Sequence, residues 1–237
     1  MFEDINLQQI FIELLWIAVL AVYAFIVIYS TKKTYEWFIK KGVKKHEAIY
    51  YNRKLIHIFA GGVISLFVPF VFTSPWYPLL CGLGLTVFTF GSHKGEKTLY
   101  WFQTEKDFND VNFCLMWGVT IFVLWIITNN PWIAIIPSAF MALGDGITGI
   151  VRNLAFRERS KHPIGNLYMV CVCLPLGYYL FVLGGRAELA VVGVIAAIVA
   201  SVVERYEIGP LDDNILITIG SSVVIYLGLI FGPMILS

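Results

Sequence analysis

The chain of 237 residues is 58% hydrophobic and only 14% charged. Soluble domains carry about 25% charged residues, so this composition excludes an ordinary soluble domain and indicates an integral membrane protein. The formal net charge of +1 gives no electrostatic reason to expect a nucleic-acid partner.

Eight apolar runs follow one another along the chain. They predict an all-α fold, a polytopic bundle of about eight transmembrane helices in a single integral membrane domain over residues 1–237, surrounded by membrane lipid. Several runs are shorter than the roughly 20 residues that a helix needs to cross the hydrocarbon core, and tilt or local thinning of the bilayer can absorb the mismatch. The eight runs are Ile10–Ser30, Leu55–Phe72, Trp76–Phe90, Val111–Thr128, Pro131–Val151, Gly165–Leu183, Leu189–Val203 and Asn214–Phe231.

The distribution of basic residues predicts the orientation of this bundle. Of the 17 Lys and Arg residues, 16 fall in or beside alternate loops, and the opposite side keeps only Arg186. The positive-inside rule makes the basic loops cytoplasmic and places both termini on the non-cytoplasmic side. The 16 residues are Lys32, Lys33, Lys40, Lys41, Lys44, Lys45, Arg53, Lys54, Lys94, Lys97, Lys106, Arg152, Arg157, Arg159, Lys161 and Arg205.

Asp145 is the only charged residue in the run Pro131–Val151, where Gly144 and Gly146 flank it. An ionised side chain at membrane depth is costly unless it is paired, so it normally marks a functional site. Glycines on both sides suit a carboxylate that meets a small and closely approaching partner, such as a phosphate or a metal ion. The carboxylate can hold Mg²⁺ that bridges phosphates, or accept a proton from an attacking hydroxyl. A simple bond to a neighbouring helix is the alternative.

A basic cluster opens the second apolar run. Arg53 and His57 are four residues apart and Lys54 and His57 are three apart, so the three share one face of a helix. Arg can bind two phosphate oxygens at once, and Lys adds a point charge. We therefore expect Arg53 and Lys54 to bind phosphate at the cytoplasmic boundary. Basic anchoring beside lipid headgroups is the alternative.

A second basic group lies in the loop before the sixth run. Lys161 precedes a predicted helix start that contains Gly165 and Asn166. Free N–H groups at such a start favour an anion, so we expect these residues to contact phosphate. A plain basic cytoplasmic loop is the alternative.

Acidic residues gather around the last predicted cytoplasmic turn. Glu204 closes an apolar run, and Asp213 and Asn214 open the next one. Neighbouring carboxylates that face a basic cluster predict a second set of metal ligands. Asp212 also fits a plain helix cap, since Asp is a favoured residue at that position.

These four motifs occur in a fixed order: Arg53-Lys54-x-x-His57, Gly144-Asp145-Gly146, Lys161 with Gly165, and Glu204 with Asp213-Asn214. In this order they resemble the polyprenol kinase family, which includes dolichol kinase, phytol kinase and the CTP-dependent diacylglycerol kinase of fungi. The resemblance covers Asn52 to about Ile217. The family is similar to the CDP-diglyceride synthases, which use CTP and Mg²⁺ on a related helical framework.

The chain departs from the family's pattern in two places. The family tends to have Lys-Thr-Phe-Glu-Gly-Ser/Thr where this chain has Lys161-His162-Pro163-Ile164-Gly165-Asn166, so an acid and a hydroxyl are missing. A Glu and an Arg often found late in the third helix are replaced by Gly91-Ser92-His93-Lys94. These differences bear on the nucleotide contact and the choice of substrate. They leave Asp145 and the last acidic cluster in place.

The resemblance implies a membrane lipid kinase that transfers the γ-phosphate of CTP, or of ATP, to the hydroxyl of an isoprenoid or polyprenol-type lipid alcohol at the cytoplasmic face. The implied catalytic residues are Asp145, His57 and Lys161. The implied ligands of Mg²⁺ are Asp145, Glu204 and Asp213. The implied nucleotide- or phosphate-binding residues are Arg53, Lys54, Lys161, Gly144, Gly146, Gly165, Asn166 and Asn214.

Two other functions remain open on the same residues. A CTP-dependent cytidylyltransferase that makes a CDP-activated lipid would use the same cations and acids. An ion-coupled transporter would use Asp145 as its carrier group, but the sequence has no clear internal repeat, and the polar groups gather at one face instead of the midplane. Gly61-Gly62 and Gly82-x-Gly84 allow close helix packing within or between chains, so a homo-oligomer is also left open.

Overall fold

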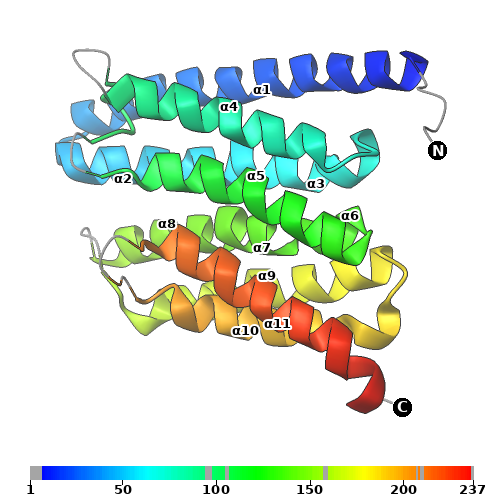
Figure 1. Cartoon of the computed structure of the whole chain (residues 1–237). Coiled ribbons are helices and arrows are strands. Elements are labelled where there is room, and N and C mark those ends of the chain that lie inside the picture. Colours follow the sequence, from blue (N-terminus) through cyan, green and yellow to red (C-terminus); the bar gives the residue numbers. More distant parts are fainter. Residues whose placement is uncertain are drawn as a thin grey trace.

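The computed structural model describes residues 7–93, 98–104, 107–156, 160–206, 208 and 211–235. Across these residues the chain folds into helices that pack side by side in one bundle (Figure 1). Five residues that contribute to the predicted basic loops lie outside the described residues: Lys94, Lys97, Lys106, Arg157 and Arg159.

The first half of the chain forms five α-helices, which are α1 (Leu7–Lys40), α2 (Lys45–Ile56), α3 (Val63–Val71), α4 (Trp76–His93) and α5 (Asn109–Thr128). A π-helical segment, η1 (His57–Gly62), joins α2 to α3, so that the backbone stays helical from Lys45 to Val71. α1 continues well past its predicted apolar run and ends only at a turn before α2.

The second half begins with two short helices, α6 (Pro131–Ala134) and α7 (Ile136–Ala139), followed by a π-helical segment, η2 (Phe140–Gly144), and α8 (Asp145–Phe156). The remaining elements are α9 (Pro163–Leu183), the 3₁₀-helix η3 (Ala187–Leu189), α10 (Ala190–Val203) and α11 (Asp213–Ile235). Asn130, directly before α6, caps the start of this helix. Its side chain accepts hydrogen bonds from the N–H groups of Trp132 and Ile133 at 3.0 and 3.3 Å.

Each of the eight predicted apolar runs is helical except at single residues, Phe72 after α3 and Ile135 between α6 and α7. Six helical segments among the described residues are long and apolar enough to cross a bilayer, which confirms a membrane-spanning helical protein. The six segments are Leu7–Lys40, Lys45–Val71, Asn109–Thr128, Pro131–Phe156, Pro163–Leu183 and Asp213–Gly232. α4 and α10 fall outside this set, so the count of eight crossings stays a prediction.

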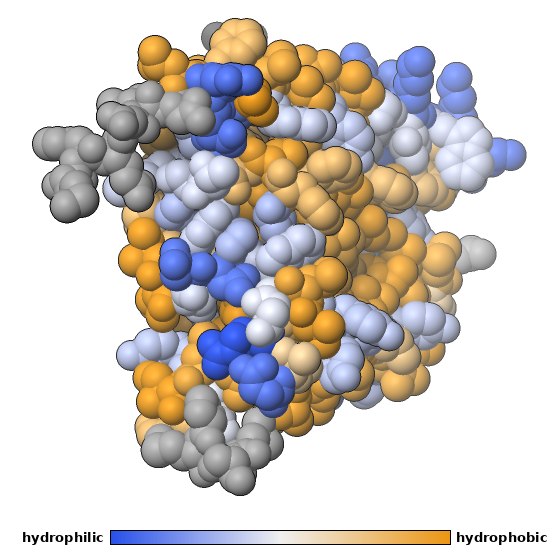
Figure 2. All heavy atoms as spheres, turned by 90° about the vertical axis from the view of Figure 1, so that its right-hand side faces the viewer, coloured by the Kyte–Doolittle hydropathy of each residue, from blue (hydrophilic) through white to orange (hydrophobic). Residues whose placement is uncertain are grey.

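The segment that contains Asp145 is the centre of the bundle. In Pro131–Phe156, 83% of the most apolar stretch is buried, against 22–39% in the other five spans. The flanks of the bundle instead carry exposed large apolar side chains such as Phe70, Val87 and Leu167. Figure 2 shows the end of the bundle where α1 begins, with apolar residues along the flanks and hydrophilic residues gathered on the end face. Such apolar flanks suit contact with lipid.

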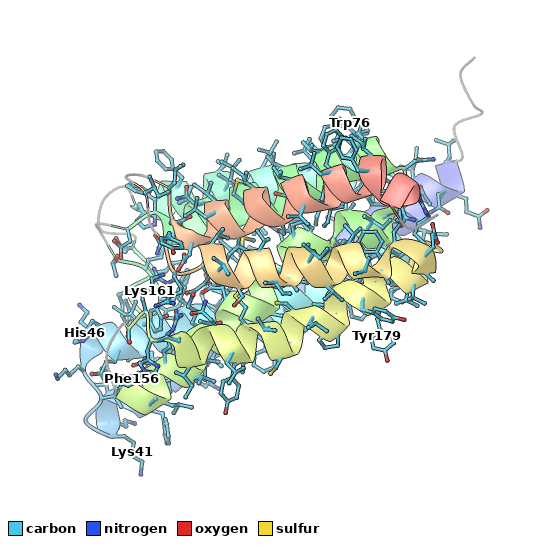
Figure 3. All side chains as sticks on the ribbon, turned by 90° about the horizontal axis from the view of Figure 1, so that it is seen from below. Lys41, His46, Trp76, Phe156, Lys161 and Tyr179 are labelled. Carbon is cyan, nitrogen blue, oxygen red and sulfur yellow. The ribbon has the colours of Figure 1, made fainter. Side chains whose placement is uncertain are left out.

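α1 begins and α11 ends at the same end of the bundle, as Figure 1 shows. The opposite end carries the predicted basic loops, where Lys41 and Lys161 are labelled in Figure 3, while Trp76 and Tyr179 lie toward the end where α11 stops. Lys41 and Lys161 come from two different predicted basic loops, so their position at one end agrees with the predicted alternation of the loops.

Contacts at both of its ends fix α1 against the rest of the bundle. At one end the buried Glu13 carboxylate accepts hydrogen bonds from the N–H and hydroxyl groups of Thr73, at 2.6 and 2.7 Å. At the other end Asn52 donates to the Thr31 carbonyl at 2.7 Å, and the Trp101 indole donates to the Ile28 carbonyl at 3.1 Å. Between these contacts α1 runs along the outside of the bundle.

Candidate functional site

Two π-helical segments pack against each other at the heart of the site. One is η1, which begins at His57, and the other is η2, which ends at Gly144, directly before Asp145. π-Helical turns are rare and occur frequently at functional sites, because the additional residue in the turn re-aims the neighbouring side chains. Here they bring the imidazole of one segment to the carboxylate that follows the other.

Asp145 is almost fully buried and is paired with a buried lysine. Its side chain is 1% exposed, and it accepts hydrogen bonds from Lys54 Nζ on both oxygens, at 2.6 and 2.5 Å. His57 Nδ1 lies 3.4 Å from Asp145 Oδ2. The His57 ring is held in place by Phe113, with ring centroids 4.0 Å apart and nearly parallel planes. The predicted cost of a charge at membrane depth is thus offset by an ammonium group on the neighbouring helix.

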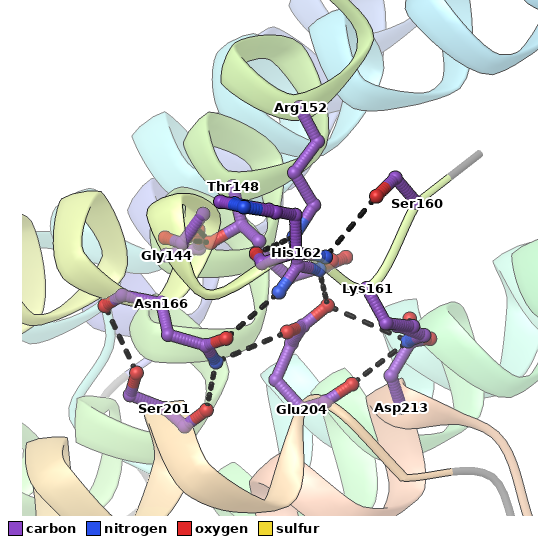
Figure 4. Close-up of polar contacts among 12 residues, drawn as sticks. Gly144, Thr148, Arg152, Ser160, Lys161, His162, Asn166, Ser201, Glu204 and Asp213 are labelled. Carbon is purple, nitrogen blue, oxygen red and sulfur yellow. Dashed lines mark hydrogen bonds and ion pairs between the residues drawn. The ribbon is translucent and has the colours of Figure 1, made fainter. Parts of the chain in front are cut away.

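Arg152 joins three segments at the same end of the bundle. Nη1 donates to Glu204 Oε1 at 2.7 Å, Nη2 to Asn166 Oδ1 at 2.9 Å, and Nε to the His162 carbonyl at 2.9 Å (Figure 4). The guanidinium group therefore ties α8 to the start of α9 and the end of α10. The sequence places Arg152 beside a basic loop and on one helix stripe with Asp145 and Gly149, but it does not show which residues the guanidinium contacts. Its position seven residues after Asp145, on the same stripe of a helix, is the signal that points to this role.

Lys161 reaches the acidic residues from the loop before α9. Its Nζ donates to the Glu204 carbonyl at 2.8 Å and lies 3.5 Å from Glu204 Oε1 and 3.4 Å from Asp213 Oδ2. The Asn166 side-chain amide donates to Glu204 Oε2 at 3.3 Å and to the Ser201 carbonyl. The Lys161 side chain is 32% exposed, so the cluster is open to solvent at this point.

Three carboxylates meet inside this network. Asp145, Glu204 and Asp213 are all buried, and each places one carboxylate oxygen within 4.8 Å of the others. They are the same three residues that the sequence analysis expects as metal ligands. Mg²⁺ lies about 2.0–2.1 Å from its oxygen ligands, so oxygens on opposite sides of one ion are roughly 4 Å apart. The donor set thus fits a divalent ion after small side-chain movements.

Three cationic side chains face these three carboxylates. Lys54 contacts Asp145, Arg152 contacts Glu204, and Lys161 lies near Glu204 and Asp213. The charges of the cluster therefore balance in the structure. A divalent cation alone would add two positive charges to a buried place, which is costly, whereas a cation that arrives with an anionic ligand keeps the balance.

Asn214 and Asp212 hold the start of α11. Asp212 Oδ1 accepts a hydrogen bond from the Ile215 N–H at 3.1 Å, which is the capping role that its position suggested. Burial and the neighbouring charge of Asp213 raise the pKa of the Asp212 carboxyl. The Asn214 side chain donates to the Asn109 carbonyl at 3.1 Å and to Asp212 Oδ2 at 3.2 Å. Its observed contacts are thus structural, and a contact with a nucleotide stays a prediction.

The three glycines predicted to bind phosphate each lie against another side chain. A Cβ atom on Gly144 would meet Cys173 and Met169, one on Gly146 would meet Ile58, and one on Gly165 would meet the Arg152 guanidinium. Close helix packing therefore accounts for these glycines. A direct phosphate contact at the same positions stays a prediction.

Two cavities adjoin the site, and Arg53 lines both. The smaller has a volume of about 140 Å³ and a polar lining that includes Tyr50 and Asn153. The Asn153 amide is buried, and neither its nitrogen nor its oxygen has a hydrogen-bond partner among the described residues. The larger cavity has a volume of about 360 Å³, and His57 lies in its wall. Arg53 thus lies between the two cavities, directly before Lys54 in α2, and makes no ion pair with the three carboxylates among the described residues.

A second polar group that the sequence analysis did not identify lies across the larger cavity. The Asp110 carboxylate lines the cavity and is held by His93 Nε2 at 3.0 Å and by the Gln103 amide at 2.5 Å. Gln103 in turn accepts hydrogen bonds from the Ser92 hydroxyl and the Leu99 N–H, both at 2.9 Å. Ser92 and His93 of this network belong to residues 91–94, where the chain departs from the polyprenol kinase pattern. Residue 94 is outside the described residues.

Comparisons with protein-family models, with curated proteins and with solved structures give no match for this chain. The resemblance to polyprenol kinases therefore rests on the four ordered motifs alone. The structure adds to them the contacts and distances of the residues that the motifs contain.

Proposed function

We propose that this protein is a membrane lipid kinase of the polyprenol kinase type. It transfers the γ-phosphate of a nucleotide, CTP by the resemblance and otherwise ATP, to the hydroxyl of an isoprenoid or similar lipid alcohol. One observation carries the proposal: Asp145, Glu204 and Asp213 each place a carboxylate oxygen within 4.8 Å of the others. The side chains of Lys54, Arg152 and Lys161 surround these carboxylates, and an apolar cavity lies beside them.

The charge balance of the cluster favours a ligand that combines a divalent cation with phosphates. In the proposed complex, Asp145, Glu204 and Asp213 hold Mg²⁺, which supplies charge neutralisation to the triphosphate when bound. Lys54 and Lys161 bind phosphate oxygens from either side of these carboxylates, which they already contact. Arg152 keeps Glu204 and Asn166 in position.

The transfer itself needs little covalent chemistry from the protein. The acceptor hydroxyl oxygen forms a bond to the γ-phosphorus while the bond from that phosphorus to the β–γ bridging oxygen breaks. The bonding electron pair leaves with the nucleoside diphosphate, and the hydroxyl proton passes to Nε2 of His57. Asp145, 3.4 Å from Nδ1 of the same ring, stabilises the imidazolium that forms. Catalysis is then mostly positioning and charge neutralisation.

The proposed orientation follows from the basic loops. We assign the end of the bundle that carries Lys41, Lys54 and Lys161 to the cytoplasmic side, where nucleotides are available. This assignment puts both termini on the non-cytoplasmic side and lets all eight apolar helices cross the bilayer, with α4 and α10 as the shorter crossings.

The direct test is incubation of the purified protein with labelled CTP or ATP, Mg²⁺ and a panel of lipid alcohols and lipid phosphates. A lipid monophosphate together with a nucleoside diphosphate supports the kinase. A CDP-lipid together with pyrophosphate replaces it with a cytidylyltransferase. If no lipid stimulates nucleotide consumption, and purified vesicles instead accumulate a solute under an ion gradient, the protein is a transporter.

The matched variant for this test is Asp145→Asn, which keeps the shape of the side chain and removes its charge. We expect it to fold with reduced stability, because the buried Lys54 ammonium loses its carboxylate partner. We expect it to lose transfer by at least about a thousandfold, a loss of roughly 4 kcal/mol of transition-state stabilisation. Near-normal turnover by this variant would remove Asp145 from the chemistry.

A further inference from the structure

The larger cavity lies among the helices of the first half of the chain and borders the carboxylate cluster at His57. It is enclosed by α1, the α2–η1 segment, α4 and α5. In Figure 1 these helices form the upper half of the bundle, and α8 to α11 form the lower half. Its volume of about 360 Å³ lies in the range of pockets that bind small molecules.

The lining of the cavity is almost wholly apolar, and charged or polar side chains are few among the residues that form it. Its lining on α1 runs from Ile17 to Ile28, which is roughly 16 Å of helix axis at about 1.5 Å per residue. That length is about half of the hydrocarbon core of a bilayer. Arg53, His57 and Asp110 line the part of the cavity toward the end of the bundle where α2 and α5 begin. The cavity therefore matches a molecule with one polar group and an apolar chain.

His57 connects this cavity to the carboxylate cluster. The side chain is only 2% exposed, and neither ring nitrogen has a hydrogen-bond partner among the described residues. Its Nδ1 lies 3.4 Å from Asp145 Oδ2, and the residue also lines the cavity. Buried polar groups normally have hydrogen-bond partners, so Nε2, which has neither a hydrogen bond nor an ion pair among the described residues, points to a ligand. A hydroxyl in the cavity beside His57 would provide the missing partner.

The cavity is closed toward the outside by two aromatic side chains. Phe25 of α1 and Phe88 of α4 both line it, and their rings meet edge to face with centroids 5.7 Å apart. They are 37% and 38% exposed, so they also face the outer flank of the bundle. Gly84 lines the same side, and a Cβ atom built there meets no atom within 4 Å. Side chains, not tightly packed backbones, therefore close this seam between α1 and α4.

We propose that the cavity binds the leading part of a single-chain lipid alcohol. The hydroxyl lies at His57, the chain runs toward Ile17 and Trp117, and the molecule enters from the bilayer through the seam at Phe25 and Phe88. A chain longer than roughly 16 Å leaves its tail in the surrounding lipid. A two-chain lipid would have to keep its second chain outside the seam. The assignment of the alcohol as the phosphate acceptor rests on the proposed function.

Photolabelling of the full-length protein in lipid nanodiscs tests the binding site without any chemistry on nucleotides. Two long-chain isoprenoid alcohols are used, one with a diazirine next to the hydroxyl and one with a diazirine at the far end of the chain. We expect the first to label residues near His57 and Phe113, and the second to label residues near Ile17 and Trp117. A two-chain phospholipid probe serves as the comparison.

A pair of variants on α4 tests the same site by activity. Gly84→Leu places a side chain at the wall of the cavity, whereas Gly91→Leu places one in open space on the same helix, outside the cavity. We expect Gly84→Leu to raise the KM for a long-chain alcohol by about tenfold and to reduce labelling by the chain-end probe. A short water-soluble isoprenoid alcohol keeps its kcat in both variants. Gly91→Leu behaves like the unchanged protein.

The outcomes separate this inference from the proposed function. Labelling outside the cavity, or equal effects of the two glycine variants, overturns the inference and leaves the kinase assignment standing. Labelling of the cavity by the phospholipid probe that excess alcohol fails to displace shows a structural lipid and also overturns it. Labelling by the alcohols as expected, with no phosphorylated product from CTP or ATP, supports the binding site and overturns the proposed function.

Discussion

Lys54 Nζ donates hydrogen bonds to both carboxylate oxygens of Asp145, at 2.6 and 2.5 Å, and both side chains are almost completely buried. The two residues come from helices that are far apart in the chain and adjacent in the bundle. A buried ion pair of this kind adds little net stability, but removal of one partner leaves an unpaired charge in an apolar place.

The first prediction concerns this pair. Lys54→Met should lower the free energy of unfolding by about 3–5 kcal/mol, because the Asp145 carboxylate loses the ammonium group that donates to both of its oxygens. The double variant Lys54→Met/Asp145→Asn should recover part of that loss, since the unpaired charge is gone, and should remain inactive. Thermal unfolding in detergent measures both. Additive losses in the double variant would show that the two side chains are not coupled.

The second prediction concerns Arg152, whose three nitrogens contact three acceptors. Arg152→Lys keeps the charge but can satisfy fewer of these acceptors, so it should cost about 1–3 kcal/mol of stability and most of the activity. Arg186→Lys is the control, because Arg186 forms an exposed pair with Glu188 and such pairs contribute at most about 1 kcal/mol. Equal thermal shifts for the two variants would contradict a structural role of Arg152.

The third prediction concerns the acidic pair at the start of α11. Asp213→Asn removes one of the three carboxylates that lie together and should raise the Mg²⁺ concentration needed for half-maximal activity by at least about tenfold. Asp212→Asn serves as the control, because Asn also caps helices and Asp212 is not among the three. A titration of activity against Mg²⁺ compares them. The same shift in both variants would argue against a specific ligand role for Asp213.

The sequence predicted where the helices lie and which charged residues come together. It did not predict the local helix geometry around those charged residues. Long apolar runs are a strong signal, and every predicted run is helical in the structure except at Phe72 and Ile135. The alternation of basic loops was enough to place Lys54, Lys161 and Asp213 at one end. The division of Pro131–Val151 into α6, α7, η2 and α8 was not predictable, because π-helical turns depend on what packs against them.

Helix rotation explains most of what the sequence analysis missed. Arg152 was assigned to a basic loop, yet it is buried, because the face of α8 that carries it turns toward α9 and α10. The polar network of Asp110, His93 and Gln103 also depends on how α4 and α5 face each other. A single sequence states which residues share one helix face, but it does not state which neighbouring helix that face meets.

The last prediction uses two glycines with opposite surroundings. A Cβ atom on Gly149 would overlap the Lys54 side chain and approach the Tyr50 hydroxyl, whereas one on Gly91 meets no atom within 4 Å. Gly149→Ala must therefore displace a lysine that Asp145 holds by two hydrogen bonds, and it should cost about 1–3 kcal/mol of stability and reduce activity. Gly91→Ala should leave activity unchanged and keep or slightly raise stability, because Ala favours a helix by roughly 1 kcal/mol over Gly. Thermal unfolding of the two variants in the same detergent decides the matter: a Gly149→Ala protein as stable and active as Gly91→Ala would mean that the contact between α2 and α8 does not hold Lys54 in place.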